Sequence, residues 1–391
     1  MSSEDLRDKY AFVGVGVTKQ GKIPEMNADD LATQAIQLAL EDSGMKKGEV
    51  DGYIFQPGAG LSTVTPLHRA GIPAKFHWQM QTGGATAIST VAAAIGTMEA
   101  GLCQVCILLY ANNASSMRPP AGGATSGTPI APQPRSTEGA YGIFGPATSA
   151  AFMARRYMHL YGLTKRQLGA VAITFREYAN KRPEAIMYDR KLTIDDYLNA
   201  RMIVEPLCLF DCCLVNDGAV ALIITSAERA KNYKKRPVYV MGYGLDHSLR
   251  ELGGAPQDVF EWDGFITQKA GDHAFNMAGV THNDVDVAEM YDAFTFFCLS
   301  QLESYGICKK GEAGAFVEAG NLRLDGEWPS NTSGTQLSWS YLHGFTHLVE
   351  GIRQMRGECM ECQVKDAEIA MITGVGGLGV GSANACCILR R

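Results

Sequence analysis

Two stretches of the chain repeat one succession of hydrophobic and polar positions. Residues 11–16 (AFVGVG) form a short apolar run that predicts a buried strand, and a second such run follows at 53–55. Between them, apolar residues fall at helical spacing, at Leu31, Ala35, Ile36, Leu38, Ala39 and Leu40. Residues 238–244 (VYVMGYG) again predict a strand, which a helix-like stretch and a strand leading into Met290 follow. The order of elements therefore recurs.

The segment between helix and second strand also recurs. Residues 43–51 (SGMKKGEVD) and 278–286 (AGVTHNDVD) share a small residue, a glycine, an apolar residue, four mostly polar residues and Val-Asp. Gly44 and Gly279 occupy the same place in the two copies. Glycine directly after a helix suits a C-cap, because it enters the left-handed conformation without steric cost.

A third element completes each copy. Residues 84–101 show an alanine-rich helix pattern before a strand at 105–110, and residues 344–357 show an amphipathic helix pattern before a strand at 368–373. Each half is therefore predicted as β-α-β-α-β, which implies an α/β protein with parallel sheets covered by helices. We expect an N-terminal half at 1–235, containing an insertion at 115–230, and a C-terminal half at 236–391.

A long loop opens the insertion. Residues 115–146 are crowded with glycine, proline, serine and threonine and show no periodicity. They form either a mobile lid over a site or an ordinary surface excursion, and a loop of this length favours the lid. After it, residues 147–161 predict a helix that carries Arg155 and Arg156 side by side.

Composition restricts the classes of function. Hydrophobic residues make up 46% and charged residues 19%, which is typical of a globular protein with a large core. A net charge of −6 argues against a nucleic-acid partner. No apolar run is long enough for a membrane span, and the charged N-terminus resembles no signal peptide. Eleven cysteines fit a reducing cytoplasm, so we expect a cytoplasmic protein.

Two cysteine pairs have the spacing of metal or redox motifs. Cys103 and Cys106 fall in an apolar run, where residues three apart on a strand point to opposite faces and cannot hold one metal ion. Cys359 and Cys362 lie in a charged stretch, where a metal or redox role competes with buried or incidental thiols. The second interpretation is favoured, and no metal is expected.

Local sequence resembles the thiolase superfamily, in its sterol-carrier-protein branch. The resembling segments are ARRYMHLYG (154–162), EPLCLFDCC (205–213), NDGAVALIITSAERA (216–230), MYDAFTFF (290–297), GICKKGEA (306–313) and SGTQLSWSYLHGFTHLVEGIRQMRG (333–357). The resemblance implies a duplicated thiolase fold with five layers, α-β-α-β-α, and coenzyme A thioesters as substrates. It also implies a homodimer that forms through a sheet edge.

The family's reactive groups are absent at the matching positions. The nucleophilic cysteine at the start of the first buried helix is replaced by Gly84, within QTGGA (81–85). The second loop, which normally begins with Asn or His, reads YDAF and begins with Tyr291. The third loop, normally Gly-His-Pro, reads Ser-Tyr-Leu with Tyr341 in place of histidine. The late cysteine is absent from TGVGGLG (373–379). Without a nucleophile, covalent acyl transfer is not available.

Tyr291 and Tyr341 are therefore the candidate catalytic residues. A neutral phenol can donate a hydrogen bond to a developing enolate or alkoxide, whereas packing aromatics would be the alternative interpretation. His343 is a weaker candidate base, and His347, one helical turn further on, is weaker again. The resemblance assigns coenzyme A binding to Gly83, Gly84, Gly376 and Gly377. Glycines 83 and 84 would also leave room for the thiol of a second coenzyme A.

The tyrosine pair resembles two groups of relatives with different reactions. These are 2-benzoylsuccinyl-CoA thiolase, which yields benzoyl-CoA and succinyl-CoA, and steroid side-chain aldolases, which cleave β-hydroxyacyl-CoA. Both groups imply a small partner with a zinc ribbon and an OB-fold. The aldolases tend to carry histidine where this chain has Ala293, so the sequence favours thiolysis over retro-aldol cleavage. A non-catalytic acyl-CoA or lipid-binding scaffold is the third interpretation.

Overall fold

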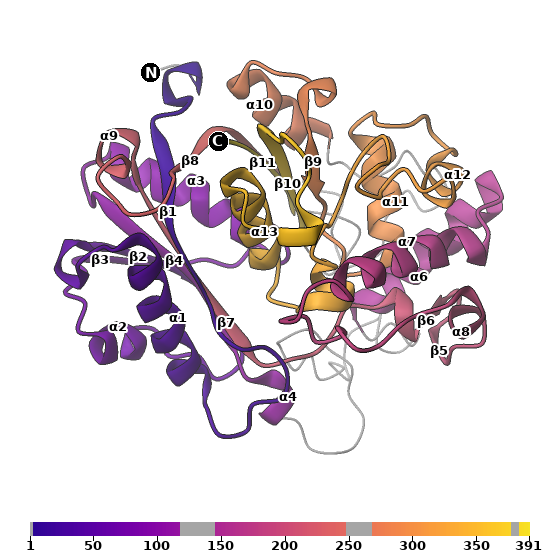
Figure 1. Ribbon diagram of the computed structural model, residues 1–391, viewed down its shortest axis with the longest axis horizontal. Helices are drawn as coiled ribbons and strands as arrows, with labels where there is room; N and C mark the ends of the chain where they lie inside the picture. The colour runs from indigo at the N-terminus through magenta and orange to yellow at the C-terminus, as the bar shows by residue number, and fades with distance from the viewer. Residues whose placement is uncertain (1–2, 118–144, 248–267, 377–382) are drawn as a thin grey trace.

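The computed structural model describes residues 3–117, 145–247, 268–376 and 383–391 (Figure 1). The N-terminal half contains β1 (Tyr10–Val17), α1 (Ala28–Ser43), β2 (Gly52–Gln56), α2 (Thr65–Ala70), β3 (Phe76–Gln79), α3 (Thr86–Glu99), β4 (Val105–Asn112), α4 (Ala114–Met117) and β7 (Gly218–Ser226). The C-terminal half contains β8 (Val238–His247), α10 (Gln268–Ala278), β9 (Val287–Glu289), α11 (Thr295–Ser304), α12 (Ala313–Glu318), a π-helical turn (Thr335–Trp339), α13 (Phe345–Arg356), β10 (Ile369–Gly376) and β11 (Ala383–Arg390).

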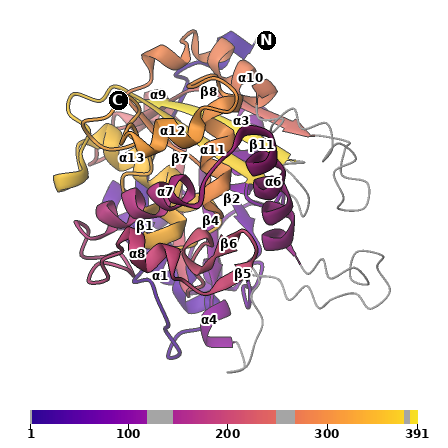
Figure 2. The ribbon, with the colours of Figure 1, turned by 90° about the vertical axis from the view of Figure 1, so that its right-hand side faces the viewer.

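The remaining elements lie between β4 and β8 in the chain, and all but the last of them precede β7. They are α6 (Pro146–Tyr161), α7 (Lys165–Ala179), α8 (Ile194–Leu198), β5 (Met202–Val204), β6 (Leu207–Cys208) and α9 (Ala227–Ala230). Helices α6 and α7 contact α11 and α12 of the C-terminal half. At the right of Figure 1, α6, α7, α8, β5 and β6 form a lobe with α11 and α12, which Figure 2 shows from its own side. Helix α9 lies apart from this lobe and packs against β1 and β7. The helix predicted at 147–161 is confirmed as α6.

Sheet topology confirms the internal duplication. The strands follow the order β3-β2-β4-β7-β1-β8-β11-β10-β9, so β2-β4-β7-β1 of one half mirrors β9-β10-β11-β8 of the other. The two half-sheets join only where β1 meets β8, at the pairs Ala11↔Tyr239 and Phe12↔Val238. The predicted all-parallel sheets are wrong, because β7 and β11 run antiparallel to their neighbours. The repeat seen in the sequence contained only strands that stand next to a helix in both copies. It therefore did not include β7 and β11, the two antiparallel strands.

Alternation along the strands produces the five layers. In β1, Phe12 faces a buried cluster that contains α3 and α13, whereas its neighbours Ala11 and Val13 face α1 on the opposite side. In β11, Leu389 faces that same middle cluster and Ile388 faces the cluster that includes α10. Period-two alternation on both half-sheets therefore places α3 and α13 between them. The five-layer α-β-α-β-α thiolase fold is confirmed.

Both predicted helix caps are present. Gly44 ends α1 at φ 70° and Gly279 follows α10 at φ 65°, each in the left-handed region. A short 3₁₀ turn follows each glycine, at Lys47–Glu49 and His282–Asp284. The two copies thus share local geometry as well as sequence.

Two further expectations concern parts of the chain outside this repeat. Most of the predicted lid, residues 118–144, lies outside the described residues; its first residues, 115–117, belong to α4. Among the described helices, none has the length and apolar character that a membrane crossing needs.

Candidate active site

Tyr291 occupies the space that a side chain at position 84 would need. A Cβ atom added to Gly84 would lie 2.1 Å from Cζ and 2.4 Å from Oη of Tyr291, and 2.2 Å from the carbonyl oxygen of Val375. Such distances are far inside van der Waals contact. The expectation that Gly84 leaves room for a second thiol is therefore wrong, because the phenol ring already fills that room.

Glycines on β10 make this close packing possible. A Cβ added to Gly376 would lie 2.0 Å from the carbonyl oxygen of Thr82, and one added to Gly374 would lie 2.9 Å from that of Gly84. The loop before α3 and the end of β10 thus approach backbone to backbone. A coenzyme A contact at Gly376 stays a prediction, as does one at Gly83, and Gly377 lies outside the described residues.

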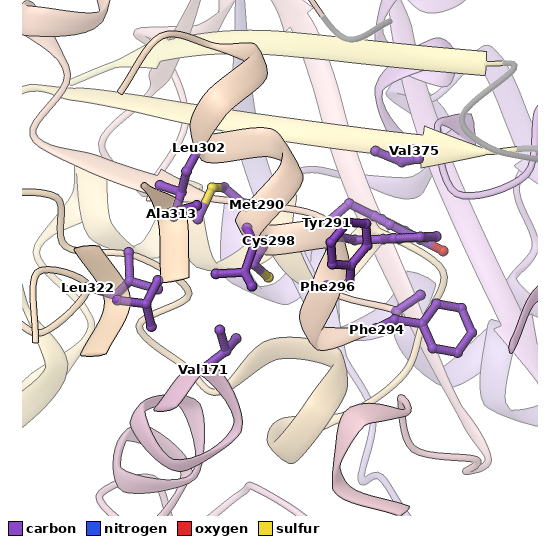
Figure 3. Packing of buried hydrophobic residues seen from close by; sticks show 14 of the residues in the cluster. Val171, Met290, Tyr291, Phe294, Phe296, Cys298, Leu302, Ala313, Leu322 and Val375 are labelled. Atoms are coloured by element: carbon purple, nitrogen blue, oxygen red, sulfur yellow. The ribbon is translucent and has the colours of Figure 1, made fainter. Parts of the chain in front are cut away.

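Hydrogen bonds of its own backbone fix Tyr291 directly after β9. Its N–H donates to Oγ1 of Thr373 at 2.9 Å, and its carbonyl oxygen accepts from Nε2 of Gln301 at 2.8 Å. Figure 3 shows the side chain at the margin of the buried cluster, with its oxygen pointing away from Met290 and Cys298.

The next residue, Asp292, ties this loop to the third one. Its fully buried carboxylate accepts hydrogen bonds from the backbone N–H groups of Gln336 (3.1 Å) and Leu337 (3.2 Å) and from the hydroxyl of Thr335. It also lies 2.8 Å from Nε2 of His347. His347 is thus held by Asp292 beneath the site and stacks on the Tyr291 ring, 5.8 Å between centroids.

Tyr341 lies beside Tyr291 on the third loop. Its N–H donates to Oδ1 of Asn216 at 2.7 Å. The two hydroxyls are close enough to affect each other's pKa, and burial raises the pKa of both above the ordinary value. Both are therefore neutral near pH 7, a state in which a phenol can donate a hydrogen bond. The structure brings the two sequence-predicted tyrosines together.

His343 is held in a neutral state. Its backbone adopts a left-handed φ of 52°, which is uncommon outside glycine. Its Nδ1 lies 2.6 Å from Nε2 of Gln56. Burial lowers its pKa to about 4. Because burial disfavours its charged form, His343 is poorly placed to carry a proton.

One segment next to the tyrosines was not identified as part of the site. Residues 212–216 run between the two tyrosine loops: the N–H of Cys213 donates to the carbonyl of Ala293, and that of Leu214 to the carbonyl of Gln336, both at 2.9 Å. The Cys213 thiol is close enough to raise the pKa of Tyr291 and Tyr341. In the sequence, this segment stood out only as part of the stretches that resemble thiolases. It shows neither helical nor strand periodicity, so the pattern assigned it no role in the site.

The cysteine pairs are buried thiols. Cys103 lies before β4 begins and packs in the same middle cluster as Cys106, so the expectation of opposite faces is wrong. Cys359 and Cys362 are buried as well, and burial raises the pKa of both. No disulfide joins the cysteines, and the described part of the chain has no cluster of three or more potential metal ligands.

Comparisons with known proteins agree with this geometry. The model of the thiolase C-terminal domain-like family matches residues 261–391. The 17-hydroxy-3-oxo-4-pregnene-20-carboxyl-CoA lyase of Mycobacterium tuberculosis is 35% identical over 95% of this chain and 97% of its own. The benzoylsuccinyl-CoA thiolase subunit BbsB of Thauera aromatica is 28% identical over 97% of both chains. A solved structure, the Ltp2-ChsH2(DUF35) aldolase, is 31% identical, with a TM-score of 0.87 over 98% of both chains.

These matches span nearly the whole chain, at an identity that fixes the family. The chain therefore belongs to the thiolase superfamily, in its sterol-carrier-protein branch, and is an enzyme of the thiolase or aldolase type that acts on coenzyme A thioesters.

Proposed function

We propose that this enzyme cleaves a β-hydroxyacyl-CoA by a retro-aldol reaction, releasing a carbonyl compound and a shortened acyl-CoA. The observation that carries this proposal is the pair of neutral phenols at the position where a nucleophile would stand, with Tyr291 filling the space above Gly84. Relatives named as a lyase and an aldolase support the same reaction.

Hydrogen-bond donors suit retro-aldol cleavage better than a nucleophile does. As the Cα–Cβ bond breaks, its electron pair moves onto the thioester and forms an enolate oxygen. The phenols of Tyr291 and Tyr341, which burial keeps protonated, are positioned as donors for such an oxygen. No acyl-enzyme is needed, which agrees with glycine at position 84.

Thiolysis is the weaker candidate. In the sequence, Ala293 in place of a histidine base favoured thiolysis. However, the benzoylsuccinyl-CoA thiolase subunit is less similar to this chain than the lyase is, at 28% against 35% identity. Thiolysis also requires a second coenzyme A thiol beside the reacting carbonyl, and the space at Gly84 is taken by Tyr291. The retro-aldol reaction needs no second thiol.

We also propose that the enzyme works as an assembly. Strand β3 is the outermost strand of its half-sheet, and Trp78 on it is 48% exposed, which suits pairing with a second copy. The solved aldolase that resembles this chain contains ChsH2(DUF35) in addition to Ltp2. This supports a small zinc-ribbon and OB-fold partner, which co-purification from the native host tests.

Free coenzyme A distinguishes the candidate reactions. The purified protein, with and without its partner, is incubated with a panel of β-hydroxyacyl- and β-ketoacyl-CoA thioesters, and the products are measured by liquid chromatography and mass spectrometry. A retro-aldolase releases carbonyl product at the same rate with or without free coenzyme A. A strict requirement for free coenzyme A would instead establish thiolysis, and binding without turnover would establish a scaffold.

A further inference from the structure

A buried chain of polar contacts joins β9 to α13. Glu289, the last residue of β9, and Glu350, on α13, are both fully buried. The hydroxyl of Thr332 lies between them, with its Oγ1 2.9 Å from Oε1 of Glu289 and 2.8 Å from Oε1 of Glu350. Two carboxyl oxygens from different elements therefore meet at one hydroxyl group inside the core.

The hydrogen bonds at this point need one more proton than Thr332 supplies. A hydroxyl group carries a single proton, so it donates to one carboxyl oxygen only. The oxygen of Thr332 also accepts from Nε2 of Gln354 at 2.8 Å. A proton on one carboxyl group completes the arrangement, because that group then donates to Thr332 and Thr332 donates to the other. Two ionised carboxylates would instead face a single donor out of contact with water, where like charges repel strongly.

The charges of the cluster give the same count. The buried guanidinium of Arg182 pairs with Oε1 of Glu350 at 2.7 Å and lies 3.4 Å from Oε1 of Glu184. Glu184, nearer the surface, also pairs with Arg353. Two arginines thus face three glutamates, so that one further proton balances the charges.

Glu289 is the better place for this proton. Within the described part of the chain, no cationic side chain lies at salt-bridge distance from Glu289, whereas Glu350 has Arg182. Oε2 of Glu289 has no hydrogen-bond partner there, which costs a carboxylate more than a neutral acid. Burial and the charge of Glu350 raise the pKa of Glu289 well above its ordinary value. Burial also raises the pKa of the neighbouring thiols and phenol, which stay neutral near pH 7: Cys359, Cys362 and Tyr178.

We propose that Glu289 and Glu350 share one proton near neutral pH, carried by Glu289, and that this proton holds the end of β9 against α13. Glu289 stands two residues before Tyr291, and α13 follows the loop that carries Tyr341. The shared proton therefore links the elements on which the two phenols depend. Its loss leaves two carboxylates facing each other across Thr332 and weakens the fold. None of this depends on which reaction the enzyme performs.

Two matched substitutions test which carboxyl group is neutral. Glu289→Gln imitates the neutral acid and can still donate to Thr332, so its urea midpoint at pH 7 should equal or exceed that of the wild type. Glu350→Gln breaks the buried pair with Arg182 and should raise the unfolding equilibrium constant about 100-fold or more. The exposed Glu361→Gln should match the wild type. Destabilisation by Glu289→Gln that is equal to or larger than that by Glu350→Gln overturns the proposal.

The pH dependence of stability tests the proton itself. The unfolded chain releases it near the ordinary glutamate pKa of about 4.3, whereas the folded protein keeps it to higher pH. Its contribution to stability is therefore fully present below about pH 4.3 and is lost as pH rises towards the raised folded-state pKa of Glu289. The unfolding equilibrium constant of the wild type, divided by that of Glu289→Gln, should rise about tenfold per pH unit between about pH 5.5 and pH 7. His343 contributes equally to both proteins, so it cancels. A ratio independent of pH contradicts the shared proton.

Infrared spectroscopy observes the protonated carboxyl group directly. The wild type at pH 7 should show the carbonyl band of a protonated carboxyl group, and this band should weaken in Glu289→Gln. Where Glu289→Gln does not fold, Thr332→Val takes its place, because it removes the oxygen that accepts the proton and should shift the band. A wild-type spectrum without the band, or a band that neither substitution changes, overturns the proposal.

Discussion

The two halves of the fold use equivalent positions for different purposes. In the N-terminal half, β2 ends at Gln56 and α3 follows a glycine loop, so this half contributes an amide and backbone. In the C-terminal half, β9 leads into Tyr291, and α13 follows the loop that carries Tyr341 and His343. Duplication preserved the strands and helices, whose buried faces are constrained by packing, whereas the loops at their ends diverged.

The glycine of one half and the tyrosine of the other depend on each other. Because Gly84 has no side chain, the ring of Tyr291 can lie directly against the loop before α3. A nucleophile at position 84 and this ring at position 291 cannot coexist without movement of the backbone. The exchange of a nucleophile for a donor is therefore one structural change spread over two halves.

The largest expected effect comes from removing the chemistry of the C-terminal half. Tyr291→Phe or Tyr341→Phe removes one donor and little volume, so turnover should fall about 10²- to 10³-fold while folding and coenzyme A affinity change little. Steady-state kinetics and calorimetric binding check this. Tyr188→Phe, a change at a residue that is 38% exposed, should have no effect. Wild-type turnover in both site variants would make the tyrosines packing residues.

A side chain added at position 84, in the loop before α3, should disrupt the packing of Tyr291 against that loop. Gly84→Ala should lower the free energy of unfolding by about 1–3 kcal/mol and impair turnover, because the added carbon overlaps Tyr291 and Val375. Removing the ring in Gly84→Ala/Tyr291→Ala should recover only part of this loss, since the Val375 carbonyl does not move. Denaturant unfolding measures both variants.

Gly96→Ala, on the helix that follows Gly84, is the matched control for that substitution. A Cβ at Gly96 meets no atom within 4 Å, so the variant should be neutral or more stable by up to about 1 kcal/mol, through the higher helix propensity of alanine. Equal destabilisation at positions 84 and 96 would contradict the steric argument.

The burial of His343, which contacts Gln56 across the two halves, should make stability depend on pH. The folded-state pKa of His343 is about 4, below the ordinary value of about 6.5, so the unfolded chain binds a proton that the folded protein refuses. This contribution is present above about pH 6.5 and is lost as pH falls towards about 4.

Unfolding free energies measured between pH 7 and pH 4.5 check this prediction. His343→Asn removes the titrating group and tolerates the left-handed backbone, so its stability should fall less steeply than that of the wild type, by about 1–3 kcal/mol across the window. The exposed His68→Asn should keep the wild-type slope. Parallel curves for wild type and His343→Asn would show that this histidine does not titrate in the window.

The smallest expected effect comes from the glycine helix caps that the two halves share. Gly44→Ala and Gly279→Ala each place a side chain at a left-handed C-cap, which costs about 1–2 kcal/mol. Because the two caps have the same geometry, the two losses of unfolding free energy should agree within about 0.5 kcal/mol. A loss at only one position would show that the repeat is conserved in sequence pattern and not in energetic role.

The sequence by itself determined the scaffold of this protein. The apolar runs, the helical spacing and the two capping glycines repeat, and each depends on residues close together in the chain. Such local periodicity decides which faces are buried, and so it predicted the duplication, whereas the five layers followed from the resemblance to thiolases. The positions of Tyr291 and Tyr341 also followed from the sequence, through resemblance to the thiolase loops.

Only the tertiary structure decided how these loops meet. Three contacts join residues far apart in the chain: Tyr291 fills the space above Gly84, Gln56 contacts His343, and the N–H of Cys213 donates to Ala293. The antiparallel directions of β7 and β11 were likewise decided only by the tertiary structure. Periodicities of two and 3.6 residues specify buried faces and carry no information on which distant loops will touch. Packing of the completed layers fixes those contacts, and with them the chemistry of the site.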